Sequence, residues 1–146
     1  MSNLGGTLNN HAMLLSLKDA GETQSDQIED SREARDLLQE AITHQEAALA
    51  LDPENSTSRQ YLKNHWWLLA RRLLDLMEHQ EAAEATESMV DVFGSRAEDH
   101  AEAATLLARC AKLASGDVRL SESDRVEQSA AYRSRQAEHD GFSKRK

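Results

Sequence analysis

The 146-residue sequence has little cysteine, proline or aromatic content, and each shortage excludes a class of structure. Its one cysteine, Cys110, excludes an intrachain disulfide and a cysteine-based zinc site. Its one proline, Pro53, leaves long stretches without a strong helix breaker. An aromatic content of 4%, beside abundant Ala, Leu, Glu and Arg, disfavours strands and favours helices. We therefore predict an all-α protein.

Long apolar runs and a surplus of basic residues are also missing. No apolar run is long enough to span a bilayer, and the first residues lack the charged start and apolar core of a signal peptide. The net charge of -9 disfavours binding to nucleic acid or to an anionic membrane. These absences predict a cytoplasmic protein with a protein or peptide partner, no nucleic-acid partner and no membrane partner.

The sequence patterns of enzymes and metal sites are absent as well. The six histidines form no His-Glu-x-x-His motif, and no two of them stand three or four positions apart. There is no Gly-x-Ser-x-Gly elbow and no glycine-rich phosphate loop. We therefore predict no enzymatic activity, no metal and no cofactor. Cys110 lies in the apolar run 106–111 and is predicted to be a buried structural thiol, and His65 a structural histidine.

Helical periodicity is the main positive signal in the sequence. Apolar residues recur three and four positions apart in six segments, at about residues 3–17, 28–51, 58–77, 79–93, 95–114 and 121–139. We predict about six helices in three antiparallel pairs (about 3–51, 56–93 and 96–139) that form one domain, 1–140. Residues 141–146 are predicted to be a frayed basic tail.

Local signals predict where several of these helices begin and end. Capping-box spacings are predicted to start three helices, at Thr57 with Gln60, at Ser95 with Glu98 and at Ser121 with Asp124. Gly94 is predicted to adopt the left-handed conformation that ends a helix. Pro53 disfavours helical geometry at Asp52 and helps to end the second helix.

The spacing of Trp66, Leu69, Ala70, Leu73 and Ala82 resembles the tetratricopeptide repeat. One repeat earlier and one repeat later, the same slots fall on Leu8, His11, Ala12 and Leu15, and on His100, Ala103, Ala104 and Leu107. The resemblance implies helix pairs stacked as a short right-handed solenoid, in which each pair buries its apolar face against the next. The alternative is an ordinary helical bundle with Ala and Leu patterning.

Four segments together resemble a narrower family. They are TLNN at 7–10, AALALDPEN at 47–55, LKNHWWLLA at 62–70 and LLARC at 106–110. They look like the repeat region that follows the kinase domain in large planctomycete serine/threonine kinases. The resemblance covers about residues 4–115 and fades after Ser115, so we expect the sixth helix to pack poorly. Kinase motifs are absent, so the resemblance implies the scaffold and not phosphoryl transfer.

In tetratricopeptide domains the first helix of each pair lines a concave groove. By resemblance, the partner-binding residues here are Asn9, Met13, Asn64, Trp67, Arg71, Thr105 and Arg109. Trp66 takes the packing slot, so its neighbour Trp67 points elsewhere. Either Trp67 lies in the groove and contacts a peptide or partner helix, or it packs on the long second helix.

Acidic residues form a stripe along the fourth predicted helix, at Glu78, Glu81, Glu84, Glu87 and Asp91. The stripe is either a solvated face or a docking edge for a basic partner. The hypothesis that follows is a noncatalytic protein-interaction scaffold that binds a peptide or partner helix in its groove. The alternative is a regulatory or oligomerising segment related to a bacterial serine/threonine kinase, and a homo-oligomer is compatible with either.

Overall fold

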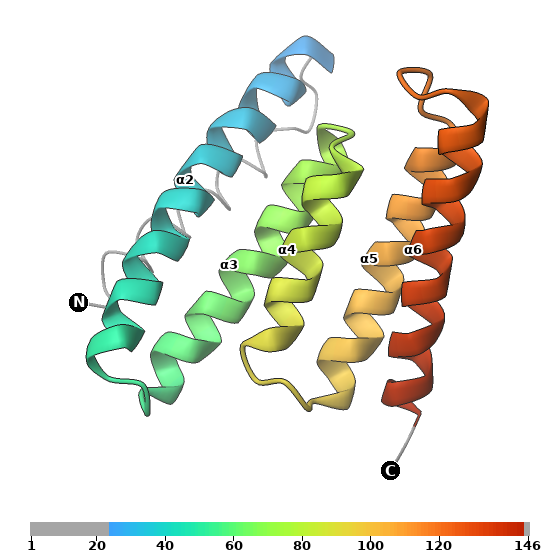
Figure 1. Cartoon of the computed structure of the whole chain (residues 1–146). Coiled ribbons are helices and arrows are strands. Elements are labelled where there is room, and N and C mark those ends of the chain that lie inside the picture. Colours follow the sequence, from blue (N-terminus) through green and yellow to red (C-terminus); the bar gives the residue numbers. More distant parts are fainter. Residues whose placement is uncertain (1–23, 145–146) are drawn as a thin grey trace.

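A computed structural model describes residues 24–144 as an all-α protein, which confirms the predicted fold class (Figure 1). Its helices are α2 (Gln24–Leu51), α3 (Ser56–Asp75), α4 (His79–Asp91), α5 (Ala97–Ser115) and α6 (Glu122–Ser143). No strand occurs in this range. The helix expected at about 3–17, with Asn9 and Met13, lies outside the described residues.

Each helix packs against the next in sequence, and the chain reverses direction at every turn (Figure 1). Short connections force this order, because consecutive helices have no room to separate. Beyond these neighbours, α3 also contacts α5 directly. The arrangement shows a sequentially packed helical protein, while the right-handed repeat stack stays a prediction.

Capping explains where some helices begin, and it corrects two predictions. Asn55 caps α3, because its Oδ1 accepts a hydrogen bond from the Ser58 backbone N at 3.0 Å, so Thr57 lies inside the helix. Ser121 caps α6 as predicted, accepting from the Asp124 backbone N at 3.1 Å. The predicted box at Ser95 is wrong, since α5 starts after Arg96 without a side-chain cap. Gly94 has the predicted left-handed backbone, with φ +85°.

Helix α6 corrects the expectation for the end of the chain. The helix continues to Ser143, so residues 141–143 are helical and not a frayed tail. The expectation of poor packing is also wrong, because α5 and α6 form the most extensive contact of any helix pair in residues 24–144. Tyr132 alone of this polar helix is buried, at 5% exposure. Hydrogen-bonded side chains replace the missing apolar face, and a hydropathy pattern does not reveal them.

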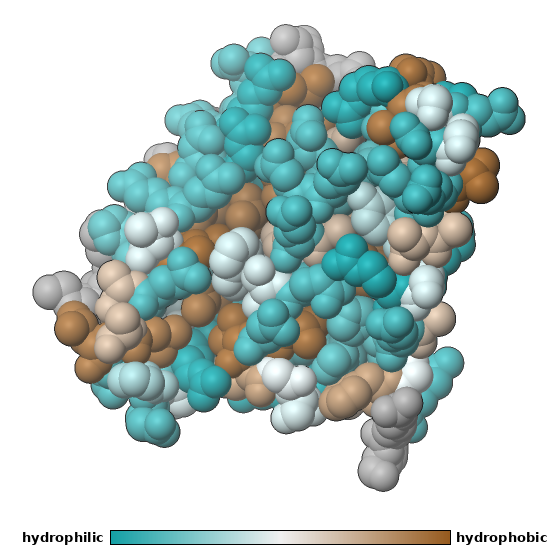
Figure 2. All heavy atoms as spheres, in the orientation of Figure 1, coloured by the Kyte–Doolittle hydropathy of each residue, from teal (hydrophilic) through white to brown (hydrophobic). Residues whose placement is uncertain are grey.

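The core is built from alanine and leucine with a few larger side chains. Small residues such as Ala70, Ala82 and Ala103 have no exposed surface, which lets helix backbones approach closely. Leu38, Leu73, Met89, Leu106 and Leu107 are the large apolar side chains that fill the space between helices. On the side seen in Figure 2 the surface is mostly hydrophilic, with apolar patches between the helices. One apolar core therefore extends across all five described helices.

Cys110 is fully buried in this core, as predicted. Burial disfavours the thiolate and raises the pKa of the Cys110 thiol to about 12. Reactivity depends on the thiolate, so this thiol is inert in the folded protein. Its role is to fill space beside α6.

Candidate partner-binding site

Trp67 is bonded to α5 through its indole N–H. Its indole Nε1 donates a hydrogen bond to Glu102 Oε1 at 2.8 Å. The Arg71 guanidinium, one turn further along α3, lies 4.7 Å from the centre of the indole ring. The indole is half-buried, so it both packs on the core and meets solvent. A Trp–Arg pair in this setting is typical of a contact residue.

A cleft of about 290 Å³ lies beside Trp67, where α3 faces α5. Its lining residues are Lys63, Asn64, Trp67, Met89, Glu98, Asp99 and Glu102. Within the cleft, Lys63 Nζ forms an ion pair with Asp99 Oδ1 at 3.1 Å, and both side chains are largely buried. The cleft therefore combines an apolar wall, an amide and three carboxylates.

The other residues predicted for the binding site lie partly inside and partly outside this cleft. Asn64 lines it and accepts a hydrogen bond from Gln60 Nε2 at 3.2 Å. Thr105 is exposed, but its hydroxyl donates to a backbone oxygen of its own helix. Arg109 is exposed and lies 4.0 Å from Asp75 of α3. The structure thus brings Asn64, Trp67 and Arg71 together and places Thr105 and Arg109 outside the cleft.

Lys63 and Asp99 line the cleft although sequence reasoning did not assign them to a site. The signal that identifies them is spacing. Lys63 bonds a residue 36 positions ahead, and Trp67 bonds one 35 positions ahead. These offsets are close to the repeat period of about 34 residues. If α3 and α5 are equivalent helices of successive repeats, residues about one period apart face each other, which predicts both contacts.

A hydrogen-bonded cluster, the first anchor, joins α4 to α6. It consists of three buried residues, His79, Asp117 and Tyr132, and the exposed Arg119. His79 Nε2 lies 2.9 Å from Asp117 Oδ2, and its Nδ1 lies 2.9 Å from Tyr132 Oη. A carboxylate only accepts, so Nε2 donates to Asp117, and Nδ1 pairs with the Tyr132 hydroxyl. Both ring nitrogens of His79 therefore have a hydrogen-bond partner.

Asp117 is the centre of charge in the first anchor. Hydrogen bonds from Arg119 and then from His79 hold the pKa of Asp117 far below its usual range. Burial raises the pKa of Tyr132 to about 12. The ring of His79 and the carboxylate of Asp117 are almost completely buried, at the side of a small cleft of about 190 Å³. The chemistry available here is structural: the cluster fastens the α5–α6 loop and α6 to α4.

A second cluster, the second anchor, joins the other end of α6 to α4 and α5. It consists of Glu87, His100, His139 and Phe142. The two histidine Nδ1 atoms lie 2.8 Å apart, and His139 Nε2 lies 2.8 Å from Glu87 Oε1. Phe142 stacks on the His100 ring with centroids 3.8 Å apart.

Three polar contacts hold the second anchor together. His139 Nε2 donates to Glu87, one histidine Nδ1 donates to the other, and His100 Nε2 faces the Gly94 carbonyl at 3.4 Å. These contacts tie α6 to α4 and α5, and they tie α5 to the α4–α5 turn.

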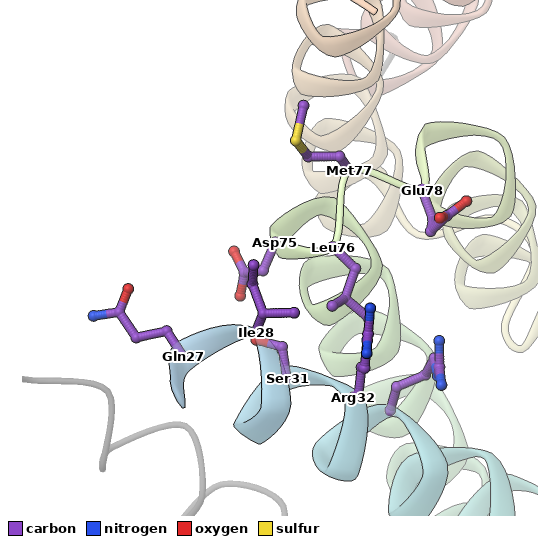
Figure 3. A pocket seen from close by; sticks show the side chains of 9 residues that line it. Gln27, Ile28, Ser31, Arg32, Asp75, Leu76, Met77 and Glu78 are labelled. Carbon is purple, nitrogen blue, oxygen red and sulfur yellow. The ribbon is translucent and has the colours of Figure 1, made fainter. Parts of the chain in front are cut away.

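A further cleft of about 480 Å³ lies between α2 and the α3–α4 turn (Figure 3). Ile28, Ser31 and Arg32 approach from α2, and Leu76 and Met77 approach from the turn (Figure 3). Met77 has φ +63°, an unusual conformation for a side chain of this size. Its charged lining is mixed in sign, with Arg32, Arg35, Asp75 and Glu78, and it contains no aromatic side chain that could anchor a partner, so it is the weaker candidate.

Searches of the described residues and of known proteins add three negative findings. Within residues 24–144 no group of three or more His, Cys, Asp or Glu side chains is placed to hold a metal ion. None of the described helices combines the length and apolar character that crossing a membrane requires. No protein-family model, curated protein or solved structure matches the chain. The resemblances to tetratricopeptide and kinase-associated repeats therefore stay predictions.

Proposed function

We propose that this protein is a noncatalytic interaction module that binds a peptide or partner helix on the face shared by α3 and α5. The observation that carries the proposal is Trp67, half-buried at the cleft, bonded to Glu102 and covered on one face by Arg71. Tryptophan and arginine dominate the binding energy of many interfaces because they bury large areas and keep polar contacts. A large aromatic side chain in this position offers an anchor for a partner.

Tetratricopeptide-like stacking belongs to the same proposal. Lys63 and Trp67 of α3 donate hydrogen bonds to Asp99 and Glu102 of α5, and Gln60 of α3 accepts one from Arg96, the N-cap residue of α5. Each bond joins residues 35 or 36 positions apart, and a nearly constant offset is the pattern of two helices that run in the same direction and lie in register. Such a register supports equivalent helices of successive repeats, whose period is about 34 residues. In that arrangement the first helices line one continuous binding face.

Selection from a displayed random peptide library, with this protein immobilised, tests the proposal. We expect binders whose affinity falls about tenfold or more when Trp67→Ala is introduced, as for interface hot spots. The control is Val126→Ala, because Val126 is 67% exposed on α6, away from the cleft. Failure to recover any Trp67-dependent binder would overturn the proposal.

A second candidate is an oligomerising segment, as the kinase resemblance implies. One observation favours it: Val118 and Val126 are large apolar residues exposed at 86% and 67%. Val126 also lines a shallow cleft of about 570 Å³ on α6. Light scattering over a concentration series tests this candidate, and Val126→Glu is expected to shift any dimer towards monomer. A constant monomer mass at high concentration rules it out.

A further inference from the structure

We propose that the cleft between α3 and α5 accepts a basic side chain, arginine or lysine, of the bound peptide. This inference rests on the proposed function and specifies what the peptide must carry. The side chain that we expect in the cleft is cationic and has a long apolar stem. The reasons are the charge surplus of the cleft, an unsatisfied carboxylate oxygen and the apolar wall.

Charge is the first reason. Glu98, Asp99 and Glu102 line the cleft, and Lys63 is the only cation among its lining residues. Lys63 is already paired with Asp99. Glu98 is 72% exposed, and its ion-pair partner Arg96 lies 3.8 Å away at the outer rim. The cleft therefore has a surplus of negative charge that attracts a cation and repels an acidic side chain.

The second reason is an incomplete set of hydrogen bonds. Asp99 is 3% exposed, and Lys63 binds its Oδ1, but its Oδ2 is buried without a hydrogen-bond partner. A buried carboxylate oxygen left unpaired destabilises the free protein, so a ligand donor that reaches it is favoured. A guanidinium presents five N–H donors in a fixed fork and matches paired carboxylates.

The third reason is the shape and polarity of the wall. Trp67 and Met89 supply apolar surface beside the carboxylates. Lysine and arginine place their methylene stems along such surfaces and keep the charged end on the acidic groups. Arg71 already lies over the Trp67 indole at 4.7 Å, so a guanidinium is accommodated against this ring within the fold. An uncharged apolar side chain would cover the carboxylates without satisfying them.

A double-mutant cycle between protein and peptide tests the inference. The probes are synthetic copies of a Trp67-dependent peptide from the library selection. The position that carries a basic residue in the selected peptide is replaced in turn by Arg, Lys, Gln or Glu. The protein variants are wild type, Glu98→Gln with Glu102→Gln, and the matched control Glu84→Gln, an exposed carboxylate on α4. Glutamine at 102 keeps an acceptor for the Trp67 N–H. Affinities are measured by calorimetry at low and high salt, and thermal melts check that each variant is folded.

We expect Arg→Gln in the peptide to weaken binding about tenfold to wild type and to Glu84→Gln, but about twofold or less to the cleft double variant. Binding of the Arg peptide is also expected to weaken with salt. Trp67-dependent peptides that contain no basic residue, or equal losses in all three proteins, would overturn the basic-side-chain inference and leave the proposed function standing. A library that yields no Trp67-dependent peptide overturns both.

Discussion

The two sides of this helical array differ in how their polar groups are satisfied. On the side where α4 meets α6, the polar side chains within each anchor bond to one another, and the rings of His79, His100 and Tyr132 are buried. On the side where α3 meets α5, the contacts leave a cleft with a surplus of carboxylates and an unpaired Asp99 oxygen. Completed networks stabilise a fold, whereas incomplete ones are available to a partner. The comparison associates stability with the first side and supports the binding role that we propose for the second.

Removing a completed contact on the α4–α6 side is expected to have the largest effect. Tyr132→Ala should lower the free energy of unfolding by about 3–4 kcal/mol, because it leaves a cavity and removes the hydrogen bond to His79. Urea denaturation followed by circular dichroism measures this loss. The matched control is Tyr61→Ala, an exposed tyrosine on α3, for which less than about 1 kcal/mol is expected. Equal losses in the two variants would contradict the comparison.

Disrupting the second anchor is expected to act locally. Phe142→Ala removes the ring stacked on His100, so the last two turns of α6 should open more easily, by about 1–2 kcal/mol. Hydrogen exchange resolved along the chain measures this, with faster exchange confined to residues near His139. Faster exchange throughout the protein would show that the second anchor holds the whole fold.

Raising the pH is expected to lower the free energy of unfolding through two buried groups, Cys110 and Tyr132. The folded protein raises the pKa of Cys110 and of Tyr132 to about 12, above their unfolded values. Both groups then hold their protons more tightly when folded, so stability is complete below about pH 8.5 and falls as pH rises towards 12. Unfolding experiments should show a loss of about 2 kcal/mol by pH 10. The double variant Cys110→Ala and Tyr132→Phe should show a flatter profile, and an unchanged slope would contradict this assignment.

The smallest effect on stability is expected on the α3–α5 side. Trp67→Phe keeps an aromatic ring and loses only the N–H that bonds Glu102, so the free energy of unfolding should fall by less than about 1 kcal/mol. The same variant is expected to weaken peptide binding. Chemical denaturation and calorimetry on one protein preparation compare the two effects. A large loss of stability with unchanged binding would reverse the roles assigned to the two sides.

Much of the fold was predictable from the sequence because the signals are local. The apolar spacing around Leu69 and Leu73 predicted α3, the Ser121 cap predicted the start of α6, and the run around Cys110 predicted its burial. The packing of α6 was not predictable in this way. It depends on Tyr132 meeting His79, 53 positions earlier, and no local pattern marks that pair.

The candidate site was also predictable only in part from the sequence. Trp67 and Arg71 were identifiable from sequence, because two tryptophans in succession cannot occupy the same face of a helix. Their partner Glu102 lies 35 positions from Trp67, and the unpaired oxygen of Asp99 exists only once α3 and α5 are in place. The sequence by itself determined the helices and most of their buried faces, since 3.6-residue periodicity is a local property. Tertiary structure alone decided which carboxylates found partners and where the cleft between α3 and α5 formed, because hydrogen bonds between distant helices depend on how those helices pack.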